Sequence, residues 1–252
     1  MLQEGTVKTT ITKNIATITF FHPQKNSLPG ILLQKFADEI THVSANKDVR
    51  VIILRSESEN VFCAGASFAE LQAIHSPETG KKFFMGFANL ILAMKKSPKI
   101  ILTRVQGKAV GGGVGIIAAS DYAIAHQSAS IKLSELALGL GPFVIGPAVE
   151  RKVGAAAFSA LALDADWRDA LWAKQHNLYT NVFENIVDVD KEIEKFSQKL
   201  STNNPEALAE LKKVFWEGTE NWNTVLEKRA EMSGKLAMSE FTRNAIAAFK
   251  NG

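Results

Sequence analysis

The chain contains 252 residues, of which 46% are hydrophobic and 22% are charged, and its formal net charge is +3. This composition is typical of a globular protein that buries a substantial core. The charge is too small to indicate a nucleic-acid partner, and no apolar run approaches the roughly 18 residues of a membrane-spanning helix. The single cysteine, Cys63, cannot form an internal disulfide, and residues 1–12 lack the pattern of a signal peptide. We therefore expect a cytoplasmic protein.

The first half of the chain alternates strand and helix patterns. Residues 6–11 and 15–21 alternate with period two around Lys13-Asn14, which predicts an opening β-hairpin. A helix is expected beyond Pro29, where apolar residues recur at helical spacing. The pattern next predicts a buried strand over 49–54 and helices over 68–74 and 79–96.

The second half begins with strands and ends with helices. Strands are predicted over 100–103, 122–125 and 130–133. From Pro147 onward the pattern is helical over 148–153, 155–163, 167–175, 190–200 and 205–249, interrupted by a strand-like segment over 178–182. We therefore predict an α/β core over residues 1–190 and a helical region over residues 191–252.

The stretch from Val105 to Gly115 lies between a predicted strand and an apolar helix, and five of its eleven residues are glycine. Glycines allow unusual dihedral angles and a close approach to the backbone. The first N–H groups of a helix lack intrahelical partners, so such a junction suits an anion or an oxygen that becomes one. The alternative is tight packing of the helix on the strand. The spacing matches neither a dinucleotide fingerprint nor a P-loop.

A second turn of this type, Ala64-Gly65-Ala66-Ser67, also precedes a predicted helix. Two such turns could direct two backbone N–H groups at one oxygen, as in an oxyanion hole. About 20 residues beyond the glycine stretch lies Glu135, after Leu133-Ser134 and before the apolar run Leu136-Ala137-Leu138. It is either a solvated loop residue or a proton carrier that faces a pocket.

Taken together, these motifs resemble those of the crotonase superfamily, the enoyl-CoA hydratase/isomerase family, in order and spacing. They are His22-Pro23-Gln24-Lys25-Asn26-Ser27-Leu28, Phe62-Cys63-Ala64-Gly65-Ala66-Ser67, Gly107-Lys108-Ala109-Val110-Gly111-Gly112-Gly113, and Glu135 with Gly139-Leu140-Gly141-Pro142. The resemblance implies a spiral of repeated β-β-α turns and a C-terminal helical region that forms trimers or dimers of trimers. It also implies a coenzyme A thioester substrate and no permanently bound cofactor. Separately, the five histidines show no H-x-x-x-H or H-E-x-x-H spacing, so we expect no metal site.

On the matching positions, the resemblance implies that the N–H groups of Ala66 and Gly112 hold the thioester oxygen and that Glu135 carries protons. The family's hydratases have a second glutamate two residues after the triple glycine, where this chain has Gly115. We therefore favour single-glutamate proton transfer of the enoyl-CoA isomerase type. Two alternatives stay open: an enoyl-CoA hydratase of fatty-acid or amino-acid breakdown, with Glu150 or another residue as the second group, and a non-catalytic acyl-CoA-binding protein.

The resemblance also suggests contacts with the coenzyme. We expect Lys25, Ala64 and Phe68 to contact coenzyme A, and Phe249 and Lys250 to reach its adenine end. Cys63 is interpreted as a small buried residue. Aromatic residues at 83, 84 and 87 and the pair at 167 and 172 are interpreted as core or subunit contacts, some of the first group lining the acyl pocket.

Overall fold

The computed structural model describes residues 5–250, except for the side chains of Phe249 and Lys250. Its main sheet has six strands in the order β1-β2-β4-β7-β9-β11. Their bounds are β1 Thr6–Thr12, β2 Ile15–Phe21, β4 Val51–Ser56, β7 Ile100–Val105, β9 Tyr122–His126 and β11 Asn181–Phe183. The predicted hairpin is confirmed: β1 and β2 are antiparallel, and Lys13 and Asn14 between them have positive φ angles of 50° and 64°. All the other pairs in this sheet are parallel.

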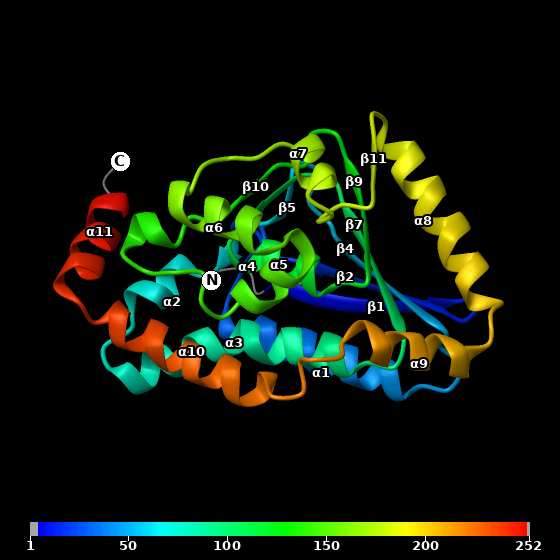
Figure 1. Ribbon diagram of the computed structural model, residues 1–252, viewed down its shortest axis with the longest axis horizontal. Coiled ribbons are helices and arrows are strands. Elements are labelled where there is room, and N and C mark those ends of the chain that lie inside the picture. The colour runs from blue at the N-terminus through cyan, green and yellow to red at the C-terminus, as the bar shows by residue number, and fades with distance from the viewer. Residues whose placement is uncertain (1–4, 251–252) are drawn as a thin grey trace.

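Helices cover both faces of this sheet (Figure 1). Successive side chains of a strand point to opposite faces. In β4, Ile52 and Leu54 therefore join the cluster that includes α1 (Gly30–Ala45), α3 (Pro77–Lys96) and α4 (Gly112–Ala119). Val51 and Ile53 join the cluster on the other face, with α8 (Ile186–Ser201) and α9 (Pro205–Phe215). A sheet buried on both faces explains the nearly continuous apolar sequence of β4.

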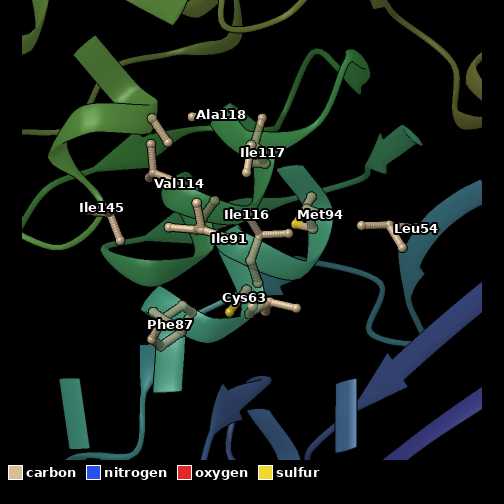
Figure 2. Close-up of a cluster of buried hydrophobic side chains, with 14 of the residues drawn as sticks. Leu54, Cys63, Phe87, Ile91, Met94, Val114, Ile116, Ile117, Ala118 and Ile145 are labelled. Atoms are coloured by element: carbon tan, nitrogen blue, oxygen red, sulfur yellow. The ribbon is translucent and has the colours of Figure 1, made fainter. Parts of the chain in front are cut away.

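The helix α4 lies inside the core and is buried from Gly113 to Ala119. Figure 2 shows its apolar side chains next to Phe87, Ile91 and Met94 of α3. A helix that is apolar on every side is stable only when protein surrounds it. This packing fixes the position of the glycine turn from which α4 starts.

Short strands form two further sheets beside the core. One has the order β10-β8-β5, from Ile131–Lys132, Lys108–Val110 and Val61–Cys63, and the other pairs β3 (Ser27–Leu28) with β6 (Gly65–Ala66). All these pairs are parallel, so within each of the two sheets the carboxyl ends of the strands lie on one side. Of these strands, the sequence predicts only β10, within the alternating segment 130–133. The other four have two or three residues each, too few to show a period of two by themselves.

The remaining helices are α2 (Phe68–Gln72), α5 (Gly146–Val153), α6 (Ala155–Asp164), α7 (Ala170–Gln175), α10 (Trp222–Ala237) and α11 (Glu240–Lys250), with a 3₁₀ turn at Leu136–Leu138. The helical stretch predicted over 205–249 is thus three helices, and the one predicted over 167–175 begins only at Ala170. The side chain of Asp169 caps α7 by accepting a hydrogen bond from the N–H of Trp172 (2.7 Å). No helix in the described part of the chain is long and apolar enough to cross a membrane.

The helices of the C-terminal region pack on the rest of the molecule. The predicted boundary between residues 190 and 191 falls inside α8, which packs on β2, β4, β7, β9 and β11. The helix α10 lies along α3 (Figure 1). There a Cβ atom placed on Gly80 would lie 2.6 Å from the Cα of Gly234, so the two helices touch through glycines. The role of residues 191–252 as an oligomerisation region stays a prediction.

Candidate active site

A cavity of about 1070 Å³ opens where the carboxyl ends of the short strands meet α2, α3 and α11. Its lining includes the predicted site residues whose side chains the structure describes: Lys25, Ala64, Ala66, Phe68, Gly112 and Glu135. The other two, Phe249 and Lys250, are at the end of α11, and their side chains lie outside the described part of the structure. Earlier residues of α11, Ala245 and Ala248, do line the cavity.

The two glycine turns touch each other at this cavity. Gly65 has a φ of +90°, and a Cβ atom placed on it would lie 3.0 Å from the carbonyl oxygen of Val110 and 3.6 Å from the nitrogen of Gly112. The backbone of Ala66 is held by Ser27, whose hydroxyl donates to the carbonyl of Ala66 (2.9 Å). Gly112 begins α4, so its N–H has no partner inside the helix. The geometry thus brings the backbones of Ala66 and Gly112 to one place.

Phe87 closes the space above Gly112. A Cβ atom on Gly112 would lie 2.2 Å from Cζ of Phe87, so any side chain there would displace this buried ring. Glycine at position 112 is therefore required by close packing as well as by access to its N–H group.

Glu135 lies against the same turn. Its carbonyl accepts hydrogen bonds from the N–H groups of Leu138 and Leu140 (both 3.0 Å), which fix its backbone. A Cβ atom on Gly111, which has a φ of +50°, would lie 2.8 Å from Oε1 of Glu135. The other carboxyl oxygen, Oε2, is buried and has no hydrogen-bond partner in the described structure. The carboxyl group thus lies against Gly111, the residue directly before Gly112.

The surroundings of Glu135 favour its protonated form. Burial raises the pKa of its carboxyl group from 4.5 to about 7, and backbone hydrogen bonds from Glu135 and Ser134 oppose only part of this effect. A carboxyl group with a pKa near neutrality can both take up and release a proton at physiological pH.

Position 115 has no room for a second acid. A Cβ atom on Gly115 would lie 2.6 Å from Cγ2 of Ile145, whose side chain is buried beside α4 (Figure 2). Glu150, the residue predicted as a possible second acid, is exposed on α5 and is not among the residues that line the cavity. Among the described residues that line the cavity, Glu135 is the only carboxylate.

Several aromatic and charged residues join the site. Phe83, Phe84 and Phe87 line the cavity, as does Phe143. Trp167 also lines it and is 44% exposed, so its interpretation as a core or subunit contact is incomplete. Lys132 also lines the cavity, and the motifs in the sequence do not predict it as a site residue. Its position between Ile131 and Leu133, which are both buried, places it on the opposite face of the predicted strand. Cys63 is buried, as interpreted, and burial raises the pKa of its thiol to about 12.

A family model described as enoyl-CoA hydratase/isomerase matches residues 10–251. The chain belongs to the enoyl-CoA hydratase/isomerase family. The predicted resemblance and the crotonase-like α/β fold are therefore confirmed.

Solved structures of this family share the fold along nearly the whole chain. An enoyl-CoA hydratase from Bacillus halodurans superposes with a TM-score of 0.89 over 96% of this chain and 99% of that chain, at 22% identity. An enoyl-CoA hydratase from Mycobacterium avium superposes with a TM-score of 0.87 over 97% of this chain and 96% of that chain, at 25% identity.

Curated relatives fall into two groups by coverage. The bacillaene synthase dehydratase PksH of Bacillus subtilis is 31% identical over 59% of this chain, and the mitochondrial methylglutaconyl-CoA hydratase of Rattus norvegicus is 32% identical over 66% of it. These alignments span 58% and 53% of the two relatives' own lengths. The short-chain-enoyl-CoA hydratase of Clostridium acetobutylicum is 27% identical over 93% of this chain and 90% of its own length.

Proposed function

We propose that this family member is an enzyme that moves a proton on a coenzyme A thioester with one carboxylate, Glu135, in the manner of an enoyl-CoA isomerase. The observation that carries the proposal is that Glu135 is the one carboxylate among the described residues that line the cavity. It lies against Gly111, beside the N–H group of Gly112, and the place of a second acid at position 115 is closed by Ile145.

The proposed reaction converts a 3-enoyl thioester into a 2-enoyl thioester. The thioester oxygen accepts hydrogen bonds from the N–H groups of Ala66 and Gly112, and the Glu135 carboxylate removes a proton from C2. The C–H electron pair forms an enolate, whose oxygen the two N–H groups stabilise. Loss of one such donor typically costs about 3–4 kcal/mol. Glu135 then gives the proton to C4, and the double bond ends between C2 and C3.

The coenzyme is proposed to enter as part of the substrate. Lys25, Ala64 and Phe68 are assigned to its contacts, since all three line the cavity. The lysine ammonium suits a phosphate oxygen. Phe249 and Lys250 are assigned to the adenine end, because the preceding residues of α11 reach the cavity. No permanently bound cofactor is part of this proposal.

Hydration of a 2-enoyl thioester is the second candidate. The names of two relatives favour it. The relative from Rattus norvegicus is a methylglutaconyl-CoA hydratase, and the relative from Clostridium acetobutylicum is a short-chain-enoyl-CoA hydratase. Hydration needs a group that positions and activates water in addition to the proton donor. Glu135 would have to perform both roles, which makes this candidate weaker. An acyl-CoA-binding protein without turnover is the third.

The purified chain and its Glu135→Gln variant can be assayed with a 3-enoyl-CoA and with the isomeric 2-enoyl-CoA. We expect the wild type to convert the 3-enoyl compound faster than it hydrates the 2-enoyl compound, and Glu135→Gln to lose at least 10²-fold in kcat, the usual contribution of a general base. Faster hydration would favour the second candidate. Thioester binding without either reaction would favour the third.

A further inference from the structure

Two lysines flank one tryptophan at the edge of the cavity. The Nζ atoms of Lys108 and Lys132 lie 5.2 Å and 5.9 Å from the centroid of the Trp167 ring. Lys132 and Trp167 line the cavity, and Lys108 lies on the neighbouring strand β8. None of these residues has a part in the proposed proton transfer.

The strands explain how these side chains share one face. Along β10 and the two residues after it, Ile131 and Leu133 are buried, whereas Lys132 and Ser134 are half-buried and line the cavity. Along β8, Ala109 is buried and Lys108 is exposed. Because β8 and β10 pair in parallel, their outward-facing side chains lie on the same side of the small sheet.

Backbone pairing holds Trp167 over this face. Arg168, the next residue, exchanges two hydrogen bonds with Ile131: the N–H of Ile131 donates to the carbonyl of Arg168 (2.8 Å), and the N–H of Arg168 donates to the carbonyl of Ile131 (2.9 Å). This pairing explains why the helix predicted from residue 167 begins only at Ala170. It sets the indole beside Lys132.

The charges of this cluster are not balanced by the described protein. Neither ammonium group forms an ion pair or a side-chain hydrogen bond with any residue that the structure describes. Cation–π attraction holds each lysine near the ring, but two ammonium groups at one ring repel each other. An anion at the cluster would remove this repulsion and accept their hydrogen bonds.

The cluster is tied to the turn of the proposed oxyanion hole. The carbonyl of Lys132 accepts a hydrogen bond from the N–H of Gly111 (2.9 Å), the residue before Gly112. A ligand group at Lys132 therefore shares the cavity with the thioester. Lys25 comes from a different element, the loop after β2, so the two lysines can bind different groups of one ligand.

We propose that Lys108, Lys132 and Trp167 form an anion subsite for a second charged group of the thioester ligand, either a carboxylate on the acyl group or a phosphate of the coenzyme. The proposal rests on the proposed thioester function. Both groups offer the same chemistry. A planar carboxylate and a tetrahedral phosphate each present negatively charged oxygen atoms that accept hydrogen bonds from ammonium groups. Ser134, two residues beyond Lys132, also lines the cavity and adds a hydroxyl group to this side of it.

Binding measurements can identify the source of the anion. Dissociation constants are measured by calorimetry, in a Glu135→Gln background that prevents turnover, for four ligands: butyryl-CoA, glutaryl-CoA, and the butyryl and glutaryl thioesters of pantetheine, which lacks phosphate. Lys132→Met and Lys108→Met are compared with Lys132→Arg, which keeps the charge. Lys199→Met removes an exposed charge from α8, on the other face of the main sheet, and serves as the matched control.

We expect each Met variant to weaken binding of the anion-bearing ligand by about tenfold, with Lys132→Arg and Lys199→Met close to wild type. Weakening confined to the two glutaryl ligands assigns the subsite to an acyl carboxylate. Weakening of both CoA ligands but of neither pantetheine ligand assigns it to a phosphate. Unchanged constants, or equal weakening of all four ligands, would overturn the proposal.

The failure of the subsite and that of the proposed function give different results. Without a subsite, Lys132→Met binds every ligand as the wild type does, and the unsubstituted enzyme still isomerises 3-enoyl-CoA. If the thioester function itself is wrong, the wild type binds none of the four ligands, and the subsite proposal falls with it.

Discussion

Glu135 combines a raised pKa with the position of a general base. In the free enzyme the carboxylate form must be present to remove a proton, and burial holds its pKa at about 7. We therefore predict that kcat/KM rises with pH up to about 7 and then levels off. A pH–rate profile checks this, and a profile that is flat between pH 5 and 8 would contradict it.

The same carboxyl group is predicted to weaken the fold at high pH. It titrates near 4.5 in the unfolded chain and near 7 in the folded chain, so its contribution to stability is complete below pH 4.5 and is lost as pH rises to about 7. The loss is on the order of 3 kcal/mol. Glu135→Gln cannot ionise, so its free energy of unfolding should exceed that of the wild type at pH 8. Denaturant unfolding at pH 4.5 and pH 8 measures this, and a gap that fails to widen at pH 8 would refute it.

The contact between Gly115 and Ile145 leads to a third prediction for single residues. Gly115→Ala places a methyl group 2.6 Å from Cγ2 of Ile145 and should cost about 1–3 kcal/mol. In an Ile145→Ala background the same substitution should cost less, because Cγ2 is gone and only the Cβ of residue 145, at 2.9 Å, still crowds the new methyl group. A double-mutant cycle by denaturant unfolding measures the coupling. Additive effects would show that the two residues do not compete for space.

The sequence predicts the residues of the candidate site better than it predicts the tertiary contacts around them. Ala66, Gly112 and Glu135 belong to local motifs, and they lie together at the cavity. The closure of position 115 by Ile145 and the approach of Trp167 to Lys132 depend on contacts between residues far apart in the chain. No local period encodes such contacts, so the structure was needed to find them.

Among elements, long strands and helices were predictable and helix contacts were not. The alternation in β1 and β2 and the apolar run in β4 carry a clear period, whereas the pairing of α3 with α10 depends on two glycines, Gly80 and Gly234. We predict that Gly234→Ala destabilises the fold by about 2 kcal/mol despite the better helix propensity of alanine, because its Cβ would lie 2.6 Å from the backbone nitrogen of Lys81.

Thermal and denaturant unfolding test this helix contact. Lys228→Ala, on an exposed position of α10, is the control and should change stability by no more than about 0.5 kcal/mol. If Gly234→Ala were as stable as the wild type, α10 could shift along α3 at little cost in free energy. The glycine contact between the two helices would then not be required for stability.

At the scale of the whole molecule, the family resemblance implies a homotrimer or a dimer of trimers. Large apolar side chains are exposed on several helices of the single chain, among them Leu163 (73%), Leu171 (61%) and Phe241 (70%). Exposed apolar surface is reduced by association. We predict a mass in solution of three or six times 27.5 kDa. Light scattering coupled to size exclusion measures it, and a monomeric mass at micromolar concentration would contradict the prediction.

In the proposed reaction, one carboxylate carries one proton from C2 to C4. A 3-enoyl-CoA labelled with deuterium at C2 can be converted in ordinary water, and the product analysed by NMR for deuterium at C4. We predict that a measurable fraction of the label reaches C4, because the buried carboxyl group of Glu135 holds the deuteron between the two steps, and that Glu135→Gln forms product at least 10²-fold more slowly. Two results together would contradict proton transfer by Glu135: a product without any label at C4, and an undiminished rate of product formation by Glu135→Gln.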